Sequence, residues 1–223
     1  MDFVSRGRLL VLEGGDGVGK TTQLPRLAAS LRELGRVVQT IREPGQTQVG
    51  QRVRELLLHP ESRISPATEA LLFLSARAQV VTEVVQPALA AGTWVIADRF
   101  FVSTYAYQIA GHGLDDAMVR AANQLATSGL VPDLTLLLTI PADVAAARRE
   151  TRGESDRLER YGADFDRRVT EAYRAAATHE WQARHPECGS IMSVPGDGAV
   201  EAVTARLVSA VMEHDAMHAV LTA

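Results

Sequence analysis

The chain has 223 residues, 46% of them hydrophobic and 22% charged, which fits one large globular α/β domain with a core that needs no disulfide or structural metal. The net charge of −4 argues against a general nucleic-acid binder, and no apolar run approaches the ~20 residues of a membrane span, so we expect neither nucleic acid nor a membrane as a partner. The single cysteine, Cys188, suits a reducing compartment and residues 1–8 lack the apolar core of a signal peptide, so we expect a cytoplasmic protein.

Strand-like and helix-like segments alternate from the start of the chain. Residues 8–13 form an apolar run that predicts a buried strand, and residues 20–34 predict a helix that ends at Gly35. Residues 36–41 predict the second strand. The long segment 66–91 then predicts a helix with apolar residues on broadly one side.

Pro87 lies near the end of this long helical segment and should bend or interrupt it. Residues 93–97 predict the third strand and residues 134–140 the fourth. Strands that alternate with helices indicate a parallel sheet covered on both faces, in which ligands bind at the carboxyl ends of the strands. The remaining predicted elements are a helix from about Ala142, a strand over 190–194 and a helix over 198–218.

A phosphate-binding loop lies between the first predicted strand and the first predicted helix. Residues 14–21 match G-x-x-x-x-G-K-[ST], and this context favours a nucleotide site over a glycine-rich turn without a ligand. Backbone N–H groups of such a loop cradle phosphates, Lys20 would reach the β- and γ-phosphates, and Thr21 would ligate Mg²⁺. The predicted ATP contacts here are Gly14, Gly15, Asp16, Gly17, Val18, Gly19, Lys20 and Thr21.

Lys20 is the only lysine among 23 basic residues, and all the others are arginine. Its position suggests a role that arginine cannot fill, such as a compact point charge among phosphates. The same count leaves no lysine for the guanine-reading Asn-Lys-x-Asp motif of a GTPase, so that class is close to excluded.

Several residues after the predicted strands have a chemical interpretation of their own. Asp98 ends the third strand beside the phosphate loop, which suits a Mg²⁺ contact through water, and Arg99 could hold an acceptor phosphate against the donor. Phe73 and Arg77 share one helix face, which suits a flat base with carbonyl oxygens, although on these residues alone a core position for Phe73 is favoured. A carboxylate inside an anion-binding loop is electrostatically unfavourable. We therefore expect Asp16 to bind a second ligand group or a water molecule held by Mg²⁺.

Six short segments together resemble one family. They are the phosphate loop, Arg42-Glu43-Pro44-Gly45, Phe73-x-x-x-Arg77, Asp98-Arg99-Phe100, Ala106-Tyr107-Gln108 and Arg152-Gly153-Glu154-x-Asp156-Arg157. In order and separation they resemble the bacterial thymidylate kinases, which are P-loop nucleoside monophosphate kinases, over residues 9–177 with a looser match beyond. Each segment alone is weak, but the combination is specific.

The resemblance implies a three-layer P-loop NTPase fold in which residues 1–223 form a single kinase domain with a five-stranded parallel sheet and a short arginine-rich lid at about 148–162. The implied activity is the transfer of the γ-phosphate of ATP to dTMP, which gives dTDP and ADP in dTTP synthesis. Mg²⁺ would accompany ATP, held by Thr21 and Asp98, and the protein would be a homodimer.

The resemblance also implies roles for individual residues. Asp16 would hold the acceptor sugar, Phe73 would stack on thymine and Arg77 would bond to the base. The implied catalytic residues are Lys20, Arg99, Arg152 and Asp16. The implied acceptor site consists of Asp16, Glu43, Arg54, Phe73, Arg77, Arg99, Thr104, Tyr107 and Gln108.

A dense basic segment surrounds Gly153, and a solvated charged stretch is the ordinary explanation for such a run. As the lid implied by the resemblance, it would close over ATP, with Arg152 at the transferring phosphoryl group and Arg149 and Arg157 on ATP. The arginines of the segment are Arg148, Arg149, Arg152, Arg157 and Arg160.

Three positions depart from the family pattern: Gln46, Val102 and Ile109. They motivate one alternative, a kinase for a related or modified pyrimidine monophosphate. A non-catalytic nucleotide-binding regulator is a second alternative, which the basic segment argues against. The turn at 194–198 lies where the family contacts adenine, and its match is poor.

Overall fold

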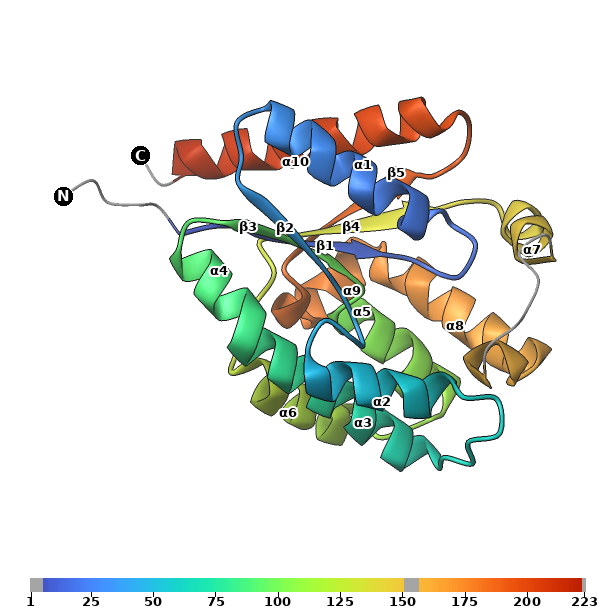
Figure 1. Ribbon diagram of the computed structural model, residues 1–223. Helices are drawn as coiled ribbons and strands as arrows, with labels where there is room; N and C mark the ends of the chain where they lie inside the picture. Colours follow the sequence, from blue (N-terminus) through green and yellow to red (C-terminus); the bar gives the residue numbers. More distant parts are fainter. Residues whose placement is uncertain (1–5, 151–156, 222–223) are drawn as a thin grey trace.

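Five parallel strands form the sheet of the computed structural model, which describes residues 6–150 and 157–221 (Figure 1). The strand order is β2-β3-β1-β4-β5, so the first strand pairs with β3 on one side and β4 on the other. This confirms the predicted parallel sheet with helices on both faces, and the strand positions differ from prediction by at most two residues. The strands are β1 (Leu9–Glu13), β2 (Val38–Arg42), β3 (Trp94–Asp98), β4 (Leu134–Thr139) and β5 (Ser190–Pro195).

Two helices cover one face of the sheet, α1 (Lys20–Glu33) and α10 (Val200–Leu221) (Figure 1). Side chains alternate across a strand, so β1 turns Leu10 and Leu12 toward these helices. They pack there in one hydrophobic cluster with residues such as Leu27 of α1, Leu31 of α1 and Leu207 of α10.

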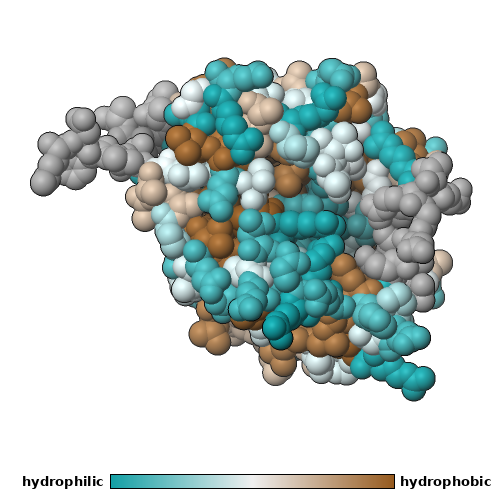
Figure 2. Space-filling model, in the orientation of Figure 1, coloured by the Kyte–Doolittle hydropathy of each residue, from teal (hydrophilic) through white to brown (hydrophobic). Residues whose placement is uncertain are grey.

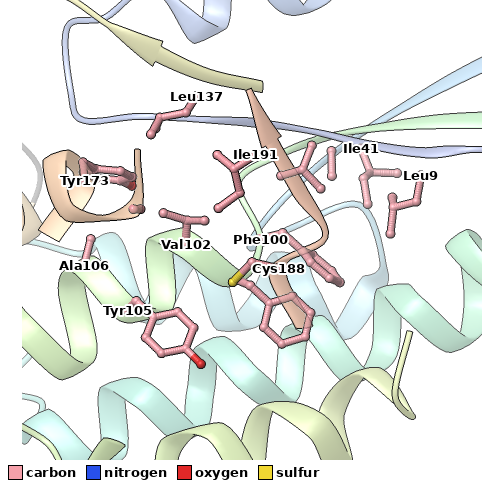
Figure 3. Packing of buried hydrophobic residues seen from close by; sticks show 14 of the residues in the cluster. Leu9, Ile41, Phe100, Val102, Tyr105, Ala106, Leu137, Tyr173, Cys188 and Ile191 are labelled. Carbon is pink, nitrogen blue, oxygen red and sulfur yellow. The ribbon is translucent and has the colours of Figure 1, made fainter. Parts of the chain in front are cut away.

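The other face carries a second cluster, to which β1 contributes Leu9 and Val11 (Figure 3). The cluster also buries Val102 and Tyr173. The elements between the strands on this side are α2 (Gln48–Leu58), α3 (Pro66–Val80), α5 (Phe101–Thr104), η2 (Tyr105–Gly111), α6 (Asp116–Thr127), α8 (Ala163–Ala176) and α9 (His179–Arg184).

Pro87 changes the helix type without ending the helical path. The α3 helix continues into a π-helical turn, η1 (Val81–Val85), and then into α4 (Gln86–Ala90). Proline lacks an N–H group and its ring crowds the preceding turn, and the wider π turn directly before Pro87 accommodates both. The expected bend or interruption is therefore a local widening, one turn earlier than the proline.

Short polar caps fix the helices that the sequence pattern did not predict. Thr47 accepts a hydrogen bond from the Gly50 N–H at the start of α2 (2.9 Å), and Asp115 accepts one from the Met118 N–H at the start of α6 (2.9 Å). None of the helices in the described ranges combines the length and apolar character needed to cross a bilayer. This fold brings three segments together at one edge of the sheet. They are the loop between β1 and α1, the end of β3, and the start of α3.

Candidate active site

A cleft of about 810 Å³ opens at the carboxyl ends of the strands. Its walls come from the phosphate loop, the loop after β2, the end of β3, α3, η2 and the turn after β5. The sequence-predicted residues that line it are Asp16, Gly17, Val18, Gly19, Lys20, Thr21, Glu43, Arg54, Phe73, Arg77, Asp98, Arg99, Thr104, Tyr107 and Gln108.

The phosphate loop needs glycine where its backbone is left-handed or tightly packed. Gly17 and Gly19 have φ angles of 85° and 104°, and Gly19 immediately precedes α1. At Gly14 a Cβ atom would lie 2.6 Å from the Leu138 carbonyl oxygen of β4, so the loop packs directly on the neighbouring strand. Gly14 and Gly15 lie behind the cleft wall, where their carbonyl groups contact Lys20.

Lys20 is nearly fully buried and donates hydrogen bonds to the carbonyl oxygens of Gly14 (2.7 Å) and Gly15 (2.8 Å). Burial lowers the pKa of Lys20 to about 8, and the positive charge of Arg99 acts in the same direction. A polyanion in the loop would favour the charged ammonium group. The titration of Lys20 should therefore be coupled to nucleotide binding.

We expect the affinity for ATP to fall as the pH rises through about 8, because binding above the pKa of Lys20 must restore its proton. Titration calorimetry in buffers of different ionisation enthalpy would measure the proton uptake. Proton uptake that does not increase as the pH passes about 8 would contradict this coupling. Since Lys20 is the only lysine, reductive ¹³C-methylation also allows its pKa to be read directly by NMR; a midpoint near the unperturbed value of about 10.4 would contradict the prediction.

Asp98 and Thr21 provide oxygen atoms at the end of the cleft formed by the phosphate loop. Asp98 is buried at the end of β3, and its Oδ1 atom has no hydrogen-bond partner among the described residues. Thr21 is exposed at the start of α1 and lines the same cleft. A buried carboxylate oxygen without a partner and a nearby hydroxyl group are the hard ligands that Mg²⁺ or its water shell prefers, so this donor set fits the ion.

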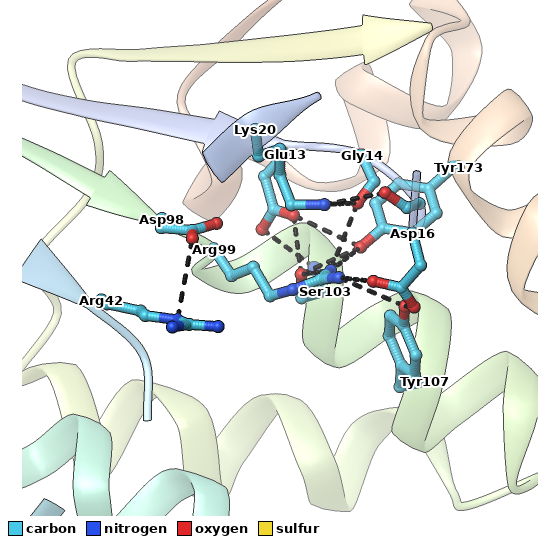
Figure 4. A network of polar contacts seen from close by, with 11 residues as sticks. Glu13, Gly14, Asp16, Lys20, Arg42, Asp98, Arg99, Ser103, Tyr107 and Tyr173 are labelled. Carbon is cyan, nitrogen blue, oxygen red and sulfur yellow. Dashed lines mark hydrogen bonds and ion pairs between the residues drawn. The ribbon is translucent and has the colours of Figure 1, made fainter. Parts of the chain in front are cut away.

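Arg99 lies between the phosphate loop and the acceptor side, in a dense polar network (Figure 4). Its backbone is left-handed, with a φ angle of 74°, which is unusual for a residue other than glycine. Its Nη2 atom donates to Asp16 Oδ1 (2.6 Å) and its Nη1 atom to the Gly14 carbonyl oxygen (3.2 Å). Asp16 also accepts a hydrogen bond from the Tyr107 hydroxyl group (2.6 Å).

Arg77 is buried on α3 and binds four groups at the far end of the cleft. Its Nε atom donates to Glu43 Oε2 (2.6 Å), and its Nη1 atom donates to Thr104 Oγ1 (2.8 Å) and Asn123 Oδ1 (2.7 Å). Its Nη2 atom donates to the Phe100 carbonyl oxygen (2.8 Å). Because a guanidinium has five N–H hydrogens, these bonds leave one Nη2 hydrogen without an acceptor among the described residues and so available to a ligand.

The other acceptor-side residues have distinct surroundings. Phe73 is half-buried, lines the cleft and lies outside both core clusters, which favours its interpretation as a ligand contact over that as a core residue. Glu43 is buried with its Oε1 atom unpartnered among the described residues, and burial raises its pKa although Arg77 opposes the shift. Arg54 donates to the Pro44 carbonyl oxygen (3.1 Å) within the loop after β2.

The arginine-rich segment, residues 148–162, is described in part. Arg148 lines the cleft, and its Nη1 atom donates to the Gly17 carbonyl oxygen (3.5 Å). Arg152 lies outside the described residues, and so does the side chain of Arg149 in α7 (Ala142–Glu150).

Arg157, which the resemblance places on ATP, lies elsewhere in the structure. It is buried in η3 (Arg157–Arg160), does not line the cleft, and donates to the Leu57 carbonyl oxygen (2.7 Å) and to Glu69 (2.6 Å). The physical reason is Glu69, whose carboxylate is fully buried on α3 and requires a cation beside it. Arg157 therefore joins the end of the arginine-rich segment to the acceptor side.

Glu69 was not predicted as part of any site. Its Oε1 atom contacts His112 Nε2 (2.9 Å) and accepts from Gln108 Nε2 (3.3 Å), and Tyr161 donates to its other oxygen. Its position in the first turn of α3 is also where an acidic residue stabilises a helix end, so no sequence pattern indicates a buried anion there.

The three departures from the family pattern lie off the cleft wall. Gln46 has a φ angle of 65°, a left-handed backbone that favours glycine, and its side chain is exposed. Val102 is buried in the second hydrophobic cluster, and Ile109 packs against that cluster. The turn after β5 does reach the cleft, through Gly196 and Gly198.

Comparison with known proteins gives one consistent result. The family model described as thymidylate kinase matches residues 12–185. A thymidylate kinase of Synechococcus sp. (strain JA-2-3B'a(2-13)) is 46% identical over 202 residues, which is 91% of this chain and 93% of that protein. Thymidylate kinases of Carboxydothermus hydrogenoformans and Deinococcus radiodurans are each 45% identical, over 75% and 76% of this chain and 83% and 82% of their own lengths.

Proposed function

The chain belongs to the thymidylate kinase family, and we infer from the family and the cleft together that it transfers the γ-phosphate of ATP to dTMP, giving dTDP and ADP. One observation carries the inference beyond the family. The phosphate loop and the Arg77 pocket face the same cleft, with Arg99 between them. This arrangement supports a donor at one end and an acceptor nucleotide at the other.

The reaction requires two polyanions to meet in line. A phosphate oxygen of dTMP attacks the γ-phosphorus of ATP, a new P–O bond forms, and the bond to the β-phosphate oxygen breaks to release ADP. The second pKa of a phosphate monoester is about 6, so the attacking group is already ionised and needs no strong base. The residues therefore act by neutralising charge: Lys20 on the β- and γ-phosphates, and Arg99 on the acceptor phosphate.

Thr21 and Asp98 are our candidates for holding Mg²⁺, Asp98 through a bound water. When bound, the ion would supply positive charge beside the phosphates of ATP. The Asp98 Oδ1 atom, which has no partner in the part of the chain that the structure describes, supports this assignment. In the arginine-rich segment, Arg148 is the described residue best placed to approach ATP, and Arg149 and Arg152 stay proposals.

Recognition of the base would depend on the remaining Nη2 hydrogen of Arg77 and the half-buried ring of Phe73. Glu43, Thr104 and Asn123 hold the Arg77 guanidinium from three other directions, so its last donor points in one direction. A fixed donor of this kind favours a base that presents a carbonyl oxygen there. Tyr107, held by Asp16, would pack against the deoxyribose.

A panel of acceptors tests the proposal. ADP production from ATP and Mg²⁺ should be strong with dTMP and weak with dUMP, UMP, CMP and dGMP, and Lys20→Ala should abolish it. Strong turnover with another pyrimidine nucleotide would mean that this nucleotide, and not dTMP, is the acceptor. ATP binding without any acceptor-dependent turnover would favour a regulator and overturn the proposed activity. The positions of Gln46, Val102 and Ile109 off the cleft wall favour dTMP.

We also propose a homodimer in the cytoplasm. Exposed apolar side chains gather on α3 and α6, including Leu71 (60% exposed), Met118 (74%) and Leu125 (83%). Figure 2 has apolar residues along its lower edge, where Figure 1 has these helices. Sedimentation should give about 48 kDa, twice the 24.1 kDa of one chain. The cytoplasmic location rests on the lone buried thiol of Cys188, which suits a reducing compartment.

A further inference from the structure

Tyr173 lies directly behind Arg99, on a helix that the sequence did not connect with the cleft. It belongs to α8, is 6% exposed and does not line the cleft. Its hydroxyl oxygen lies 2.8 Å from the Arg99 Nη1 atom and 2.9 Å from Ser103 Oγ (Figure 4). With Phe165 and Val169 it forms a buried stripe at four-residue spacing, so its ring alone would be ordinary core.

Glu13 sets the direction of these hydrogen bonds. Its carboxylate is fully buried at the end of β1 and accepts from the N–H groups of Phe100 (2.8 Å) and Ser103 (3.0 Å). The Ser103 hydroxyl group also donates to Glu13 (2.7 Å), which uses its only hydrogen.

The remaining contacts follow from this. Ser103 Oγ accepts from the Tyr173 O–H and from Arg99 Nη1 (3.0 Å), and the Tyr173 O–H also has the more distant Glu13 Oε2 (3.4 Å) as an acceptor. The two hydrogens of Arg99 Nη1 are shared among Ser103, Tyr173 and the Gly14 carbonyl oxygen. The Tyr173 oxygen in turn accepts from Arg99. Burial raises the pKa of Tyr173, so its hydroxyl group keeps its proton at neutral pH. Tyr173 therefore fixes Arg99 Nη1 from behind, while Asp16 holds Nη2.

We propose that Tyr173 is a positioning residue for phosphoryl transfer, which with Ser103 and Glu13 holds the guanidinium of Arg99 where the acceptor phosphate binds. The left-handed backbone of Arg99 makes such support necessary, because Arg99 lies in a strained turn between β3 and α5. The proposal rests on the proposed function, since it acts through the phosphate contact of Arg99. A displacement of about 1 Å at such a group can cost roughly 100-fold in rate.

The test is the Tyr173→Phe variant, which removes one oxygen atom and keeps the buried ring. We expect kcat with dTMP to fall roughly 10- to 100-fold and the KM for ATP to change little. Tyr105→Phe is the matched control, because Tyr105 is also 6% exposed but donates to Glu187, away from the cleft. Both variants should lose similar thermal stability, and Tyr105→Phe should keep the kcat of the unmodified protein.

A double-mutant cycle separates positioning from packing. In an Arg99→Ala background, Tyr173→Phe should have no further effect on the residual turnover, since the residue it positions is gone. A full additional loss in that background, or equal kcat values for Tyr173→Phe and Tyr105→Phe, would overturn the proposal. The unmodified protein is assayed alongside with the acceptor panel, so absence of turnover there would count against the proposed function itself.

Discussion

Replacing Arg99 with alanine is expected to lower kcat for phosphoryl transfer to dTMP by roughly 10³-fold, the lower end of the effect of an arginine on a transferring phosphoryl group. Arg99 contacts the phosphate loop at Gly14 and the acceptor side at Asp16, so its charge lies where donor and acceptor phosphates would meet. The KM for dTMP should rise as well. Binding of ATP should change much less, because Lys20 and the loop N–H groups are unaltered.

Steady-state kinetics with each substrate varied in turn would measure this prediction. Arg99→Lys should restore only part of the rate, since an ammonium group cannot contact Asp16 and Gly14 together as the planar guanidinium does. Arg167→Ala is the control: Arg167 is 60% exposed and pairs with the surface acids Asp164 and Glu171, so its loss should leave kcat unchanged. A kcat within about threefold of the unmodified protein for Arg99→Ala would remove Arg99 from the reaction.

The ends of the strands explain why much of the cleft could be predicted. Residues that follow parallel strands meet at one edge of the sheet, so the phosphate loop, Glu43 and Asp98 had to come together once the strands were identified. The spacing of Phe73 and Arg77 then placed both on one side of α3. These predictions needed only local patterns and the rule that parallel strands end at the same edge of the sheet.

Residues that support the cleft from behind could not be predicted in this way. Tyr173 is 74 residues from Arg99 and 70 from Ser103, and its helical stripe indicates only core packing. Asn123 on α6 contacts Arg77 across 46 residues without any local motif. Such contacts depend on how helices pack on the sheet, which a short pattern does not encode.

The contacts of Arg157 could not be predicted, for the same reason. Its place in an arginine-rich segment favoured an ATP contact, whereas its partner, Glu69, lies 88 residues away. A buried carboxylate in the first turn of α3 looks in sequence like an ordinary exposed helix-end acid. The local pattern indicated the positive charge of Arg157 but not the Glu69 carboxylate with which it pairs.

The second large effect is expected at this pair: Glu69→Ala should lower the free energy of unfolding by about 3–5 kcal/mol, because it leaves the buried guanidinium of Arg157 without its carboxylate. The variant also removes the shared acceptor of His112 and Gln108, so the acceptor KM should rise. Urea denaturation would measure the loss. Glu171→Ala is the control, since Glu171 is 56% exposed and its surface pair should contribute at most about 1 kcal/mol.

The pH dependence of this effect distinguishes the charge of Glu69 from its packing. Burial alone would raise its pKa, but hydrogen bonds from His112, Tyr161 and Arg157 lower it to about 2. The pKa in the unfolded chain is about 4.3, so the stabilisation by the carboxylate is complete above about pH 5 and is lost as the pH falls toward 2. The stability difference between the unmodified protein and Glu69→Gln should shrink across that window. A difference that stays constant down to about pH 3 would mean that Glu69 stabilises the fold by shape and not by charge.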